Sequence, residues 1–140
     1  MQRVQETRNQ ERDRASGYQL ISVETFMLDG KELSGRSAKV SLRGFYLPAG
    51  NIDLLFADQK SVIMVTTYPD IGGNVPRVPL LTDDASRDLR QYLLRCKADP
   101  GAAQIGCPIT IIGNVTMCEA SGPLGAHREL PCVAVVDGRP

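Results

Sequence analysis

Four cysteines are the residues with the clearest chemical potential in this 140-residue sequence, and all lie in its second half: Cys96, Cys107, Cys118 and Cys132. Structural zinc sites favour cysteines about two to four residues apart, whereas no two cysteines here are closer than 11 positions. Disulfides between sequence neighbours fit better, because the first cysteine of each pair ends an expected element and the second opens the next. The alternative is four reduced, buried cysteines that act as small hydrophobic side chains.

The state of the cysteines bears on where the protein works. Bridged cysteines would indicate the periplasm or cell envelope of a bacterium, and reduced cysteines the cytoplasm. No apolar run approaches the roughly 18 residues that span a bilayer, and the N-terminus is too polar for a secretory signal. We therefore expect no transmembrane segment, and export only if a leader has been removed.

Histidine chemistry is confined to one residue, His127. A metal cluster or a Ser-His-Asp arrangement would require His127 to fill every role, and Gly72 and Gly73 lack the lysine and helix start of a phosphate loop. The sequence therefore predicts a protein that is not an enzyme, with no metal site and no cofactor.

Five β-type runs and one helix are expected to position these residues. The strands are expected at residues 39–47, 52–57, 61–68, 108–118 and 132–136, and the helix at residues 84–97. The segment 70–79, rich in glycine and proline, is expected to be an irregular connection. Three strands, a helix and two further strands is the order of an OB fold, a five-stranded barrel that usually binds a ligand. The predicted fold class is thus mainly β.

Residue periodicity gives each element a buried face. Val40, Leu42 and Tyr46 alternate along the first strand and are expected to face the barrel interior. Glycines in the middle of two strands, Gly44 and Gly113, are expected to allow strong bending. The helix is expected to be capped by Thr82, Asp83 or Asp84 and to pack through the stripe Ala85, Leu89, Tyr92, Leu93 and Cys96.

The N-terminal segment differs from the rest of the chain. Residues 1–17 mix charges and offer almost no large apolar side chain for burial, so a flexible or helical extension is expected there. A single domain is expected over residues 18–140, which is close to the commonest domain size.

The strand order, the two mid-strand glycines and the run RSAKVSLRGFYL at residues 36–47 resemble a group of bacterial OB-fold proteins that are similar to tRNA anticodon-binding domains. The preceding residues resemble the short helix and polar turn that such domains place before their first strand. The resemblance implies architecture more than activity, because this barrel binds single strands, sugars, ions or proteins in different members.

These observations favour a noncatalytic binding or interaction module whose ligand is a protein, a glycan or a small molecule. The candidate contact residues are Arg43, Phe45 and Tyr68, with His127 and Arg128 in a long loop at residues 119–131. The alternative is a single-stranded nucleic-acid-binding protein that uses the basic residues Arg43, Arg87, Arg90, Arg95 and Arg128. A formal net charge of zero disfavours this alternative, because phosphate contacts need accumulated basic side chains.

Overall fold

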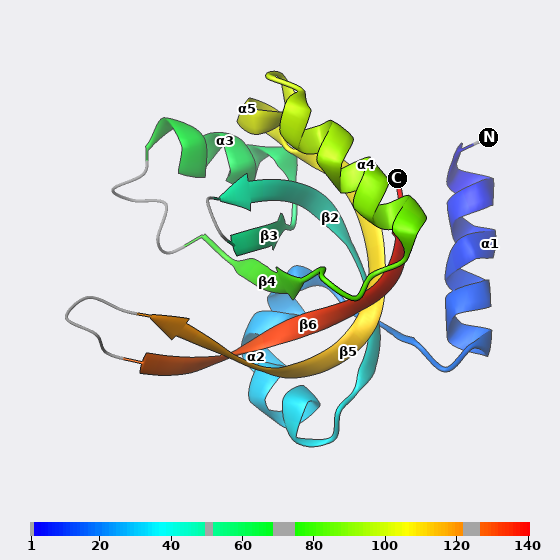
Figure 1. Ribbon diagram of the computed structural model, residues 1–140. Helices are drawn as coiled ribbons and strands as arrows, with labels where there is room; N and C mark the ends of the chain where they lie inside the picture. The colour runs from blue at the N-terminus through cyan, green and yellow to red at the C-terminus, as the bar shows by residue number, and fades with distance from the viewer. Residues whose placement is uncertain (1, 50–51, 69–74, 122–126) are drawn as a thin grey trace.

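The computed structural model describes residues 2–49, 52–68, 75–121 and 127–140 (Figure 1). Its helices are α1 (Gln2–Ala15), α2 (Val23–Gly35), α3 (Gln59–Thr67), α4 (Arg87–Ala98) and α5 (Ala102–Ile105). Its strands are β1 (Gln19–Leu20), β2 (Lys39–Ala49), β3 (Ile52–Phe56), β4 (Arg77–Leu81), β5 (Cys107–Ser121) and β6 (His127–Arg139). The predicted mainly β class is confirmed, although the strands and helices are more numerous than predicted.

The strands form one sheet in the order β1-β2-β3-β4-β6-β5, and β2 also pairs with β5. This extra pairing gives each strand from β2 to β6 a neighbour on both sides. Within this ring β4 and β6 run parallel, and the other pairs are antiparallel. Figure 1 shows the long strands β2, β5 and β6 curving strongly as they pass around the ring.

Two glycines permit this curvature. A Cβ atom on Gly44 would collide with the carbonyl oxygen of Phe56 on the adjacent strand β3. A Cβ atom on Gly113 would collide with the carbonyl oxygen of Ala134, at the point where the β5–β6 register shifts. Backbones approach too closely at both positions for any larger residue.

The main core lies inside the ring of strands. As predicted, Val40, Leu42 and Tyr46 of β2 are fully buried. They pack with apolar side chains of β5, β6, α2 and α4, among them Ile109, Ile111, Val115, Val133, Phe26 and Leu89. A second, smaller cluster of Leu47, Leu54, Phe56 and Val62 lies between the sheet and α3.

The prediction of a strand at residues 61–68 is wrong, because residues 61–67 belong to α3 and Tyr68 is its C-cap. The side chain of Asp58 accepts a hydrogen bond from the Ser61 amide at 2.8 Å and so caps the first turn. Val62 is buried and Val65 is partly buried three residues later, while Ile63 and Met64 are exposed. The β-branched composition of the segment is therefore misleading, and the capping residue is the better signal.

The third strand of the ring is β4, which lies partly in the segment expected to be an irregular connection. Val78 and Leu80 are buried and alternate with partly exposed neighbours, as in an ordinary strand. Pro79 pairs with Leu54 of β3, whereas pairing with β6 begins only at Leu80. A proline is tolerated because the ladder to β6 is not required at its position.

The last two strands are much longer than predicted. β5 and β6 remain paired from Thr110 with Arg139 to Ser121 with His127. His127 and Arg128 therefore lie in a strand and not in a loop, which corrects the prediction for residues 119–121 and 127–131, while residues 122–126 lie outside the described residues. The outer part of this β5–β6 ribbon lacks the alternating apolar pattern that identifies a half-buried strand.

Helix α4 lies between β4 and β5, as predicted for the single helix, but it begins later. Ser86 is its cap and accepts a hydrogen bond from the Leu89 amide at 3.3 Å, so the predicted caps at residues 82–84 precede the helix. Leu89, Leu93 and Cys96 are buried in the main core. No helix among the described residues is both long enough and apolar enough to cross a membrane.

The N-terminal residues form α1 and α2. α2 is capped by Ser22 and buries Val23, Phe26 and Leu33 against β4, β5 and β6. Figure 1 shows that α1 lies beside the strands, apart from the other helices.

Candidate functional site

An apolar groove of about 770 Å³ lies between α2, strands β3 and β4, and the β5–β6 ribbon. Met27 of α2, Leu54 of β3, Pro79 of β4 and Leu130 of β6 represent its four walls. Its volume falls within the range of about 300–1,000 Å³ that is typical of small-ligand sites. We call this concavity the groove.

The groove exists because β4 and β6 separate. They pair only at Leu80 with Val133 and at Leu81 with Ala134. If this pairing continued toward the N-termini of both strands, the next pair would include Pro79 of β4, and the pair after that would include Pro131 of β6. Proline has no N–H group to donate to such a ladder. Beyond this point β6 pairs with β5 alone, and β4 pairs with β3 alone.

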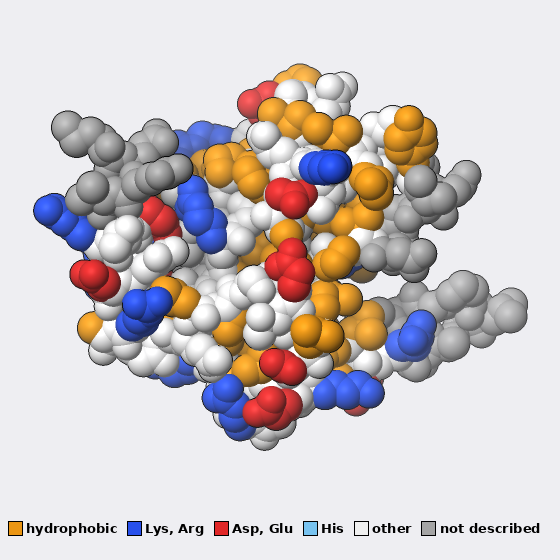
Figure 2. All heavy atoms as spheres, turned by 180° about the vertical axis from the view of Figure 1, so that it is seen from behind, with side chains coloured by type: hydrophobic (Ala, Val, Ile, Leu, Met, Phe, Trp, Pro, Cys, Tyr) orange, Lys and Arg blue, Asp and Glu red, His pale blue; other side chains and the backbone are white. Residues whose placement is uncertain are grey.

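Large apolar side chains remain exposed around the groove. The exposed fractions are 53% for Met27, 50% for Ile52, 45% for Leu81 and 38% for Leu130. Figure 2 shows hydrophobic side chains gathered on the right-hand half of the face that it presents. Contiguous exposed apolar surface of this kind often marks a binding site.

Two charged residues, Arg77 and Glu119, are among those that line the groove. The guanidinium of Arg77 lies over the Phe56 ring, 5.4 Å from its centroid, and its Nε donates to the Val75 carbonyl oxygen at 3.1 Å. Arg77 is therefore held in place by the protein itself.

The residues predicted to contact a ligand do not form one surface. Arg43 donates to the Thr110 hydroxyl at 2.7 Å and lies 3.7 Å from a carboxylate oxygen of Glu6 in α1. Phe45 packs against the smaller cluster, and Tyr68 is exposed at the end of α3. Arg128 is exposed near the start of β6, next in sequence to His127.

None of Arg43, Phe45, Tyr68 and Arg128 lines the groove. The residues that do were missed, but one sequence signal was available. Ile52, Leu54 and Leu55 give β3 apolar side chains on both faces, and half of the Ile52 surface is exposed at the groove. An apolar strand with an uncovered second face is a sign of a binding surface.

Both disulfides join neighbouring cysteines in the sequence, as the sequence analysis favoured. Cys96 at the end of α4 is bonded to Cys107 at the start of β5, with a Cα–Cα distance of 6.2 Å. Cys118 and Cys132 cross-link the β5–β6 ribbon, with a Cα–Cα distance of 5.9 Å. Because Cys118 lines the groove, the second disulfide braces one of its walls.

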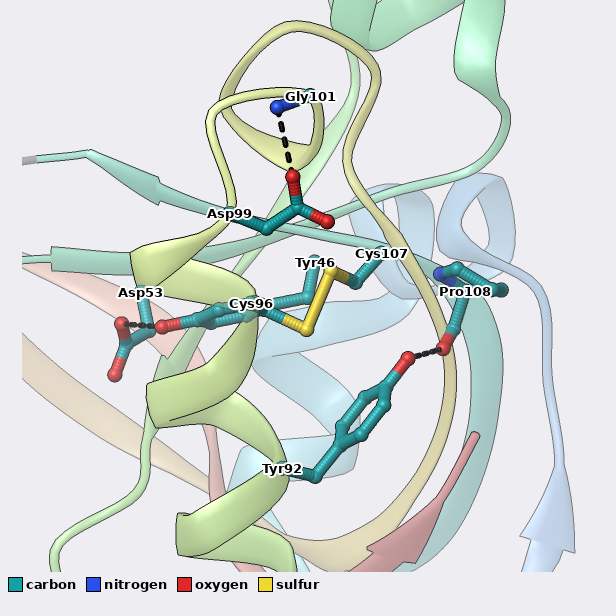
Figure 3. The surroundings of a disulfide bond; sticks show 8 residues. All are labelled: Tyr46, Asp53, Tyr92, Cys96, Asp99, Gly101, Cys107 and Pro108. Carbon is teal, nitrogen blue, oxygen red and sulfur yellow. Dashed lines mark hydrogen bonds between the residues drawn. A yellow bond between two sulfur atoms is a disulfide. The ribbon is translucent and has the colours of Figure 1, made fainter.

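A polar network lies near the first disulfide, as Figure 3 shows. The Tyr46 hydroxyl donates to Asp53 Oδ1 at 2.5 Å, and the Thr82 hydroxyl donates to Asp53 Oδ2 at 2.8 Å. Burial, and then the hydrogen bond and charge of Asp53, raise the pKa of Tyr46 above its ordinary value. Tyr46 therefore stays protonated and acts as a structural donor.

The described residues contain no group of three or more His, Cys, Asp or Glu side chains that could hold a metal ion. The site that the described chain does form is an apolar groove with two charged groups at its margin. Neither a family model nor a curated protein matches the sequence.

Proposed function

We propose that this protein is a noncatalytic binding module with an OB fold, and that an apolar ligand occupies its groove. The ring β2-β3-β4-β6-β5, with α4 before β5, has the strand order of that five-stranded barrel. OB folds bind ligands across their second and third strands and the loops beside them. The groove lies between the corresponding strands, β3 and β4, and the β5–β6 ribbon.

The observation that carries the proposal is the apolar lining of the groove. Sugars are held by several polar side chains, whereas α2, β3 and the ribbon contribute Met27, Ile52 and Leu130. A small hydrophobic molecule or an acyl chain matches this lining better than a glycan does. Filling the groove would remove the exposed apolar surface of these side chains from water.

The two disulfides support a location in an oxidising compartment, and we place the protein in the bacterial cell envelope or periplasm. Lipids and other apolar molecules pass through that compartment. We infer a bacterial origin from the resemblance to bacterial OB-fold proteins.

The experiment is a titration with an uncharged naphthylamine dye that fluoresces in apolar surroundings. Saturable binding to a single site is expected for the unaltered protein. Met27→Glu and Leu130→Glu place a charge on opposite walls of the groove, so each should weaken dye binding at least about tenfold.

Leu94→Glu is the matched control, because Leu94 is exposed on α4 and does not line the groove. This variant should bind the dye as the unaltered protein does. Equal binding by all four proteins would show that the dye binds elsewhere and would refute the assignment of the groove.

Single-stranded nucleic acid is the second candidate ligand, because Arg87, Arg90 and Arg95 are exposed along α4. However, Arg43 pairs with Glu6, and α4 lies far from the start of β6, which carries Arg128. Retardation of a mixed-sequence oligonucleotide that weakens steeply with salt would favour this candidate. No retardation by micromolar protein at low salt would remove it.

A further inference from the structure

Helix α1 is held against the strands by charged and hydroxyl groups. The carboxylate of Asp13 accepts hydrogen bonds from the Ser41 hydroxyl at 3.0 Å and from Arg139 Nη2 at 3.1 Å. About two helical turns earlier, the carboxylate of Glu6 also accepts a hydrogen bond from Arg139 Nη2, at 3.1 Å, and lies 3.7 Å from Arg43. Two carboxylates from α1 thus converge on one guanidinium nitrogen.

The described side chains of α1 give it little apolar contact. Among the described side chains of α1, at residues 5–15, the one apolar side chain is Ala15, and it is exposed. A polar helix of 14 residues is marginal in water on its own. Ion pairs such as these contribute little net free energy once desolvation is counted. α1 is therefore bound weakly to the surface beneath it.

That surface offers positively charged and hydroxyl groups to the two carboxylates. It comprises Ser41 and Arg43 of β2, Thr110 of β5 and Arg139 of β6, and we call these four residues the arginine site. Ser41 and Thr110 are buried, with only 3% and 2% of the residue surface exposed. A cavity of about 430 Å³, lined by both polar and apolar groups, adjoins Ser41, Arg43 and Thr110.

The donors of the arginine site are not all used. The Nε atom of Arg139 is buried and has no hydrogen-bond partner among the described residues. Burial opposes the charged form of Arg139, but hydrogen bonds with Asp13 and Glu6 outweigh this effect and raise its pKa. The guanidinium is thus always charged and keeps a free donor, a good partner for phosphate oxygens.

We propose that the arginine site binds a diphosphate group, and that Glu6 and Asp13 of α1 occupy it as an internal competitor until the ligand displaces the helix. Two linked phosphates match two carboxylates that meet at one guanidinium, with Arg43 and the two hydroxyls as further donors. This site is separate from the groove and does not depend on the function proposed for it.

The competition predicts how affinity responds to substitution. A tethered helix acts at an effective concentration in the millimolar range, so it weakens the apparent affinity of a free anion. Removing the two negative charges of α1 should relieve this competition. We expect Glu6→Gln/Asp13→Asn to raise the affinity for inorganic pyrophosphate at least about tenfold.

The experiment measures pyrophosphate binding by calorimetry at constant ionic strength. The control is Glu11→Gln/Asp29→Asn, which changes net charge equally at exposed positions of α1 and α2. Its affinity should equal that of the unaltered protein. Adding Arg139→Gln to the Glu6→Gln/Asp13→Asn protein should abolish the gain. Equal affinity of the two double variants, or no saturable binding by either, would overturn the proposal.

Hydrogen exchange of the unaltered protein tests displacement directly and needs no variant. Pyrophosphate should accelerate exchange of the α1 amides with a saturating dose response, while α2 amides stay protected. Sodium chloride at matched ionic strength should have a smaller effect. Equal effects of the two salts would show screening alone and would overturn the proposal. A nucleoside diphosphate in parallel distinguishes a nucleotide ligand from a free diphosphate.

Discussion

The hydroxyl of Tyr46 in β2 donates a hydrogen bond to the carboxylate of Asp53 in β3, at 2.5 Å, beside the Cys96–Cys107 disulfide. Thr82 and Lys97 reach the same carboxylate, at 2.8 and 3.7 Å, from the segments before and within α4. The carboxylate of Asp53 therefore connects β3 with β2, through Tyr46, and with α4, through Lys97.

Tyr46→Phe should destabilise the protein by about 1–2 kcal/mol, because Asp53 loses a donor in a partly buried place. The raised pKa of Tyr46 also makes stability depend on pH. Its stabilising effect is complete below pH 10, roughly the ordinary tyrosine pKa, and falls as pH rises further, because the unfolded chain then releases a proton that the folded chain keeps.

Denaturant unfolding of both proteins between neutral pH and pH 11 or so measures this effect. The stability difference between the unaltered protein and Tyr46→Phe should shrink above pH 10 or thereabouts. A difference that stays constant across this range would contradict the account of Tyr46.

The two mid-strand glycines should tolerate no larger residue. Gly44→Ala and Gly113→Ala would each push a methyl group into a backbone carbonyl oxygen, so we expect a loss of about 3 kcal/mol or more, or no folded protein. Gly35→Ala in α2 is the control, because a Cβ atom there meets nothing within 4 Å. Thermal unfolding should show an unchanged or higher midpoint for the control, and three similar midpoints would disprove the argument from close approach.

The disulfides should differ in their effect on the groove. Replacing either pair by serines should cost roughly 3 kcal/mol of stability in the chain-entropy estimate, because the loops have similar lengths. Only the Cys118→Ser/Cys132→Ser protein should also lose dye affinity, since Cys118 lines the groove. Equal dye affinities of the two folded double variants would mean that the groove does not depend on the Cys118–Cys132 disulfide.

The mass of the unreduced protein, measured before and after thiol labelling, checks that both disulfides form in the native cell.

The cap of α3 offers a local test of the least expected helix. Asp58→Ala removes the acceptor of the Ser61 amide and should cost about 1 kcal/mol. Asp83→Ala and Asp84→Ala, at exposed positions before α4, should have little effect. Denaturant midpoints distinguish the three variants, and a harmless Asp58→Ala would count against a cap at this position.

Local patterns account for what the sequence predicts well. Alternation of Val40, Leu42 and Tyr46 reports the buried face of β2, and helical spacing of Leu89, Leu93 and Cys96 reports that of α4. The pairing of Cys96 with Cys107 follows from a helix that ends, and a strand that begins, near those residues, whereas Cys118 and Cys132 lie inside β5 and β6, which extend beyond both. Each of these signals is contained within one segment or two adjacent ones.

The failures have tertiary causes. Val62 and its apolar neighbours suit a strand, yet Asp58 starts a helix there; Pro79 argues against a strand, yet β4 forms because β6 does not pair with it at that position. The groove arises where β4 and β6 separate, and these strands are distant in the sequence. Arg43 was a candidate contact for an external ligand, but its partner is Glu6 of a helix far from it in the chain.

The central claim is that an apolar ligand occupies the groove. Methyl NMR spectra recorded during a titration with decanol test it most directly. Saturating shifts are predicted for the methyl groups of Met27, Ile52, Leu81 and Leu130, while Leu94 and Ile105, equally exposed but outside the groove, stay unchanged. Shifts confined to Leu94 and Ile105, or uniform small shifts without saturation, would contradict the claim.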